Sequence, residues 1–148
     1  MRDRRCVPVF TDMSNPSSPP TTVSNIGVAM FTIANQDAAI AYYTQTLAWE
    51  LRADVAFGDE GGNRWVEVAP PGSTARLALN PPMGEWQPGG SAIGVETPDV
   101  NAEYARVTAI DGVITTRPIG GEGPVPRMFS IVDPDGNHIW VVQAAAER

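Results

Sequence analysis

Three side chains capable of acid–base chemistry lie in short, otherwise apolar segments of strand length: Glu67, Glu96 and His138. A carboxyl group between apolar neighbours can act as a general acid or base, or pair with a cationic ligand. His138 is the only histidine, so it is the only imidazole available for proton transfer near neutral pH. The three are the catalytic candidates, and two carboxylates with one imidazole could also hold a metal ion at an atypical site.

Each candidate also has a structural explanation. Either carboxylate could form a salt bridge with Arg64, Arg76 or Arg127, or could lie exposed to solvent. A single histidine on a strand is more often a surface residue than a proton shuttle. The spacing of the three candidates does not require a metal ion.

The residue types that are absent exclude several classes of chemistry. All ten cationic residues are arginine, so no lysine is present for a Schiff base or a phosphate-binding loop. The single cysteine, Cys6, allows no internal disulfide, thiolate zinc cluster or Cys-x-x-Cys redox pair. The net charge of −7 disfavours electrostatic binding of nucleic acid. With no apolar run long enough for a membrane span and no signal-peptide pattern, we expect a cytoplasmic protein without membrane partners.

A length of 148 residues is typical of one domain. We expect residues 1–22 to be a flexible tail, because Met13–Thr22 is rich in Pro, Ser and Thr and has no apolar period. Val7–Phe10 could dock as a short strand. Residues 23–148 are the expected domain.

Within that domain, one order of elements occurs twice. The first passage has a helix capped by Asn35, and four expected strands at Ile26–Ile33, Glu50–Phe57, Arg64–Ala69 and Ala75–Asn80. The second has a helix capped by Asp99, and four expected strands at Ala92–Thr97, Val113–Arg117, Met128–Val132 and His138–Gln143. The repetition predicts one supersecondary unit used twice, although the residues themselves show little identity between the halves.

This doubled unit, with Asn35–Tyr43 (NQDAAIAYY) opening the first helix and Asp133–Asn137 (DPDGN) before the last strand, resembles the vicinal oxygen chelate superfamily. Its members include glyoxalase I, extradiol dioxygenases, fosfomycin-modifying enzymes and bleomycin-binding resistance proteins. The resemblance implies an α+β fold of two βαβββ units, at residues 24–82 and 91–144. Their curved sheets would form a half-barrel cleft with helices on the outer face. One departure is Leu47-Ala48, where the family commonly has Leu-Gly, so the first helix could end differently here.

The family enzymes hold one metal ion in the cleft, through side chains at four strand positions. Carried over to this sequence, those positions are Val28, Ala78, Ala92 and Trp140, none of which can ligate a cation. The resemblance therefore implies a member without the usual metal site and without a cofactor. Strand alternation supports this register, because it places a continuous apolar set on the opposite, helix-facing side: Ala29, Phe31, Leu77, Leu79, Ile139 and Val141.

With the metal positions apolar, the cleft would offer two indoles, a Met and small residues beside a few polar groups. Such a lining suits a flat or apolar organic molecule. The expected ligand-binding residues are Val28, Met30, Trp65, Glu67, Ala78, Asn80, Ala92, Glu96, Ser130, His138 and Trp140. Because two chains often complete each other's cleft in this family, we also expect a homodimer.

Three functions remain open from the sequence. The first is metal-independent binding of a small aromatic or apolar molecule, in the manner of antibiotic-sequestering proteins. The second is a lyase, isomerase or dioxygenase-type enzyme that uses Glu67 or Glu96 as base, or an atypical metal site. The third is an interaction module, for which the acidic surface and the Pro-rich tail give thin support.

Overall fold

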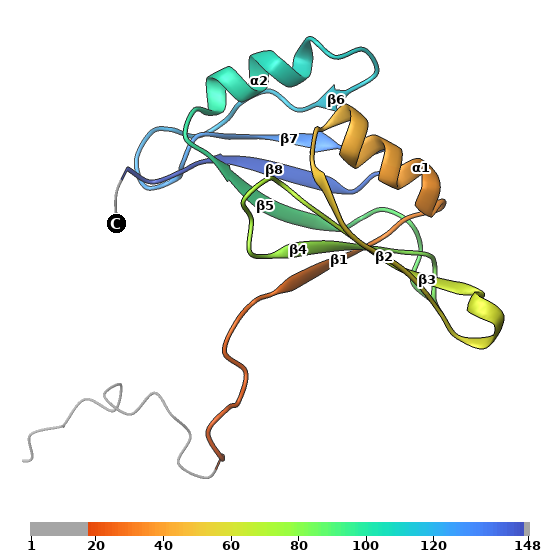
Figure 1. The fold of residues 1–148 in the computed structure, drawn as a ribbon. Coiled ribbons are helices and arrows are strands. Elements are labelled where there is room, and N and C mark those ends of the chain that lie inside the picture. Colours follow the sequence, from red (N-terminus) through yellow and green to blue (C-terminus); the bar gives the residue numbers. More distant parts are fainter. Residues whose placement is uncertain (1–17, 147–148) are drawn as a thin grey trace, which may run out of the picture.

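The computed structural model describes residues 18–146, which contain two four-stranded sheets, each with its own helix (Figure 1). The first unit contains β1 (Val28–Thr32), α1 (Gln36–Ala41), the π-helical turn η2 (Tyr42–Thr46), β2 (Glu50–Phe57), the short 3₁₀ turn η3 (Asp59–Gly61), β3 (Asn63–Ala69) and β4 (Arg76–Asn80). The second contains β5 (Ala92–Thr97), α2 (Val100–Thr108), β6 (Ile114–Thr115), β7 (Met128–Val132) and β8 (His138–Gln143). Residues 18–27 form no helix or strand, and the strand considered at Val7–Phe10 lies outside the described residues.

The two sheets have the same topology. The strand orders are β1-β4-β3-β2 and β5-β8-β7-β6. In each sheet the first strand runs parallel to the last strand of its unit, and the other neighbours are antiparallel. This repetition confirms the predicted α+β fold of two βαβββ units.

Both helices begin at the predicted caps. The Asn35 side-chain oxygen accepts a hydrogen bond from the Ala38 amide at 2.8 Å, and the Asp99 carboxylate accepts one from the Ala102 amide at 3.0 Å. Each cap supplies an acceptor to a backbone N–H that has no partner within its helix. Local sequence is therefore sufficient to fix where α1 and α2 start.

The first helix ends in an unusual way. It widens into η2, and Ala48 then adopts the left-handed conformation with a φ of 62°. That conformation brings an alanine Cβ close to backbone and costs about 1–2 kcal/mol, whereas glycine adopts it freely. The Leu47-Ala48 departure thus leaves a strained residue at the helix end.

One buried core serves both units. Side chains from the helix-facing side of the two sheets belong to a single cluster, which includes Phe31, Leu79, Ile139 and Val141. The expected helix-facing residues are therefore buried, and the sheets share the core through that side. The opposite faces of the two sheets are turned away from this core.

A buried hydrogen-bond network joins the units at the turn before β8. The Tyr43 hydroxyl donates to an Asp133 carboxylate oxygen at 2.9 Å, and both residues are almost completely buried. The other oxygen of that carboxylate accepts the Asn137 amide at 2.8 Å, while the Asn137 side chain donates to the Thr32 carbonyl at the end of β1. Burial and the neighbouring Asp133 raise the pKa of Tyr43 far above its usual range, so the hydroxyl keeps its proton and remains a donor.

We expect Ala48→Gly to stabilise the protein by about 0.5 kcal/mol, because the relief of left-handed strain exceeds the added entropy of the unfolded chain. The free energy of unfolding in urea measures this change. Ala105→Gly, in the exposed middle of α2, is the matched control and should destabilise by about 1 kcal/mol. Equal destabilisation by both substitutions would contradict the assignment of strain to Ala48.

Candidate functional site

On the open face of the first sheet, the predicted residues surround an ion pair. The Trp65 indole N–H donates to one Glu67 carboxylate oxygen at 2.8 Å, and Arg76 Nε contacts the other at 2.6 Å. Glu67 is only 9% exposed. Arg76 balances the charge of its carboxylate, and both carboxylate oxygens have a partner. Arg64 instead pairs with Asp37 and Asp54. In this arrangement Arg76 and Trp65 engage both carboxylate oxygens, so neither oxygen is free to accept a proton from a substrate.

The other predicted residues of this face give it an apolar floor. Ala78 pairs with Met30 on β1 and with Glu67 on β3, and Ala78 is fully buried. Met30 is 56% exposed, while Val28 and Asn80 are more covered. The carboxylate–guanidinium pair thus lies on the same face as the exposed Met30 and the buried Ala78.

On the open face of the second sheet, three predicted residues are in contact. Ser130 Oγ lies 3.0 Å from His138 Nδ1, and the imidazole stacks on the Trp140 indole with centroids 6.4 Å apart and planes inclined by 20°. Ser130 is completely buried, whereas both rings are partly exposed. These rings provide a flat aromatic surface with one polar edge.

The β5 edge beside those rings is open. Ala92 pairs with His138 and Gly94 pairs with Trp140, and both small residues are exposed. A Cβ built at Gly94 would meet no atom within 4 Å. A molecule could therefore approach the Trp140 ring from this side. Glu96, further along β5, is exposed and forms no salt bridge within residues 18–146.

The two open faces do not form one cluster in a single chain. Between residues 18 and 146, no hydrogen bond, salt bridge or ring contact joins Trp65 or Glu67 to His138 or Trp140. The catalytic candidates are likewise separate, since Glu67 lies in the first sheet while Glu96 and His138 lie in the second. In that part of the chain, no three His, Cys, Asp or Glu side chains are grouped closely enough to hold a metal ion.

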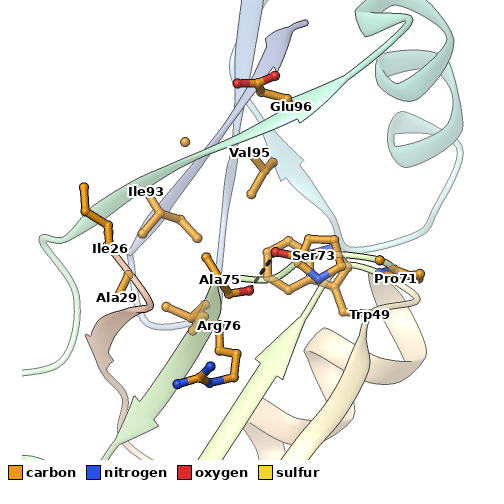
Figure 2. A pocket seen from close by; sticks show the side chains of 14 residues that line it. Ile26, Ala29, Trp49, Pro71, Ser73, Ala75, Arg76, Ile93, Val95 and Glu96 are labelled. Carbon is orange, nitrogen blue, oxygen red and sulfur yellow. Dashed lines mark hydrogen bonds between the residues drawn. The ribbon is translucent and has the colours of Figure 1, made fainter. Parts of the chain in front are cut away.

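A larger hollow lies along the seam between the units, as Figure 2 shows. Its volume is about 560 Å³, and its lining includes Trp49, the Pro70–Ser73 turn, Arg76 and Leu77 of β4, and residues 93–96 of β5, among them Gly94. Of the predicted ligand-binding residues it includes only Glu96. The sequence predicted a strand that ends at Ala69 and gave no role to the turn that follows it. The groove itself depends on how the two units pack, which no local pattern encodes.

No helix within the described residues has the length and apolar character needed to cross a membrane.

Comparison with known proteins places this architecture in a family. The sequence profile of the Glyoxalase/Bleomycin resistance protein/Dioxygenase superfamily matches residues 25–141. A search of curated proteins found no match.

Among solved structures, the antibiotic binding protein TnmS3 from Streptomyces sp. CB03234 is 30% identical, with a TM-score of 0.72 over 85% of this chain and 100% of that one. A superfamily member from Sphaerobacter thermophilus DSM 20745 is 29% identical, with a TM-score of 0.71 over 82% of this chain and 98% of that one. The bleomycin-binding protein of Streptomyces verticillus, solved with copper(II)-bleomycin, shares the fold at 22% identity and a TM-score of 0.62, over 83% and 99% of the two chains. With the profile spanning both βαβββ units, the chain belongs to the glyoxalase/bleomycin resistance protein/dioxygenase superfamily.

Proposed function

We propose that this protein binds an aromatic or apolar small organic molecule without a metal ion. The observation that carries the proposal is the partly exposed Trp140 ring beside the open space at Gly94. An accessible indole offers a stacking surface worth about 0.5–1.5 kcal/mol per aromatic pair beyond the buried area. The Trp65 face adds a second indole and the exposed Met30.

The residue types at four strand positions support metal independence. The resemblance assigns the four ligand positions of the family enzymes to Val28, Ala78, Ala92 and Trp140 of this chain. None of these side chains has a lone pair suited to Zn²⁺, Mn²⁺, Ni²⁺ or Fe²⁺. Glu67, which could ligate, is already held by Arg76 and Trp65.

We further propose that the binding site is completed by a second copy of the chain. The Trp65 face and the Trp140 face belong to different sheets, and each is open in the single chain. A two-fold arrangement would place the Trp65 face of one protomer opposite the Trp140 face of its partner. Each cleft would then combine two indoles, one ion pair and one imidazole around the ligand.

The comparisons support ligand binding as the function. TnmS3 is described as an antibiotic binding protein, and another structural relative was solved with bleomycin. We infer that an organic natural product is the kind of ligand to test first on this chain.

An enzyme remains the second candidate because of Glu96. This carboxylate is exposed, lies at the rim of the seam groove and has no salt-bridge partner in the described part of the chain, so it is the better placed of the two proposed bases. Turnover of a carbonyl compound that is lost in Glu96→Gln would favour an enzyme over a binding protein.

Purified protein should carry less than about 0.1 divalent ion per chain, because the four family ligand positions hold no ligating atoms. Elemental analysis after dialysis measures the content. A chelator should leave the melting temperature unchanged, and added Zn²⁺ should not raise it. Stoichiometric metal that survives dialysis would overturn the metal-free proposal and favour an atypical site.

Analytical ultracentrifugation at tens of micromolar should give a mass of about twice the 15.8 kDa of one chain. The physical reason is that the open faces expose apolar side chains such as Met30 that a second copy would cover. A species of single-chain mass at that concentration would contradict the shared-cleft proposal.

The neutral aromatic probe 2-(hydroxymethyl)fluorene should quench tryptophan fluorescence, and Trp140→Phe should lose most of the quench. Phenylalanine keeps a ring and most of the volume, so it avoids the roughly 3–5 kcal/mol that truncation of a large buried side chain costs. Circular dichroism and thermal unfolding would verify that the variant is folded.

Two further variants test whether the probe binds at the Trp140 face or in the seam groove. Trp49→Phe lies at the seam groove and should leave the quench largely intact. Ala92→Leu changes an exposed β5 residue that pairs with His138 and does not line the groove, and it should hinder access to the two rings. Loss of the quench in Trp49→Phe, with retention in Trp140→Phe, would move the ligand to the groove.

A further inference from the structure

Ser130 and His138 form a hydrogen bond that runs from the core to the open face. Ser130 Oγ is completely buried, and His138 Nδ1 at 3.0 Å is its only hydrogen-bond partner within residues 18–146. The Ser130 backbone is occupied separately, since its N–H donates to Thr116 Oγ and its carbonyl accepts the Thr116 amide. The hydroxyl proton therefore has one acceptor available.

Counting protons in this pair fixes the imidazole tautomer. If Nδ1 carried a proton and donated it to Ser130, the serine hydroxyl proton would be buried without an acceptor, which costs about 1–3 kcal/mol. If the hydroxyl donates to Nδ1, both groups are satisfied. The neutral ring then carries its proton on Nε2.

The Nε2 edge belongs to the open face. His138 lies between Ala92 on β5 and Val132 on β7, and it is partly exposed. Ala92 is short and exposed, so it leaves that side of the ring uncovered. No hydrogen bond from Nε2 to any residue between 18 and 146 is present. The His138 Nε2–H is therefore a free hydrogen-bond donor at the edge of the aromatic surface that the imidazole forms with Trp140.

We propose that His138 is a specificity-determining residue whose Nε2–H donates to a carbonyl oxygen of a planar ligand stacked on Trp140. Ser130 is the positioning residue, because it acts through the imidazole. The ligand class is aromatic ketones and quinones. This inference rests on the proposed binding function and adds the functional group that is recognised.

A neutral acceptor fits the charges around the site better than a carboxylate does. Arg76 is paired with Glu67, so its charge is balanced. Glu96 lies on the same face of β5 as Gly94 and is exposed, so it would repel an anionic group. The polar donors at the rings are the imidazole and the Trp140 indole N–H, and neither carries a charge when the imidazole is neutral.

The tautomer is measurable without any ligand. Because the chain has a single histidine, a long-range ¹H–¹⁵N spectrum of the imidazole reports His138 alone. At a pH where the ring is neutral, we expect the Nε2–H form in the native protein and a mixture of both forms in Ser130→Ala. Ser24→Ala, in the exposed segment before β1, is the matched control and should give the native spectrum. An Nδ1–H form in the native protein would overturn the proposal.

Recognition of the carbonyl is tested with two neutral probes that differ in one group, 2-(hydroxymethyl)-9-fluorenone and 2-(hydroxymethyl)fluorene. Both have the same ring system and charge, so the ratio of their affinities isolates the ketone. Calorimetry should show roughly 2- to 10-fold tighter binding of the fluorenone, as expected for one hydrogen bond. His138→Phe keeps a stacking ring without a donor, and it should reduce this ratio to about one.

The possible outcomes separate the two proposals. Equal affinity of the two probes for the native protein, or a ratio that His138→Phe and Ser130→Ala leave unchanged, overturns the role of His138 while ligand binding stands. Failure of both probes to bind counts against the proposed binding function, and the tautomer spectrum still decides whether Nε2 is a donor.

Discussion

The carboxylate of Asp133 holds the two units together from a buried position at the start of the turn before β8. It accepts the Tyr43 hydroxyl from the first unit and the backbone amides of its own turn, and Asn137 extends the network to the end of β1. A buried carboxylate needs several donors to offset its desolvation, and here the donors come from both halves of the chain. The network therefore fixes the packing of one unit against the other.

That packing determines where a ligand could bind. The two sheets meet through their helix-facing sides, so each opposite face is left with the small and aromatic residues that alternation assigns to it. The same packing creates the groove beside Trp49, which neither unit would have alone. The candidate sites are thus of two kinds: faces defined by strand alternation, and a seam defined by tertiary packing.

Local sequence predicted much of this fold. The bounds of β2, β5, β7 and β8 match the predicted strands, because apolar alternation and flanking turns define them. The expected strand at Val113–Arg117 shortens to the two residues of β6 at the edge of its sheet. The partner of Glu67 depended on register, since Arg76 enters the same face through the β3–β4 pairing while Arg64 turns toward Asp54. The groove could not be predicted, because it arises between units.

The single shared core has a consequence for how this duplicated chain folds. Phe31 and Leu79 of one unit are buried in the same cluster as Ile139 and Val141 of the other. A chain cut in the connection between the sheets would leave each half with an exposed apolar layer, which a domain of about 60 residues tolerates poorly. The internal repeat therefore behaves as one cooperative unit, in which the two copies gain and lose their structure together.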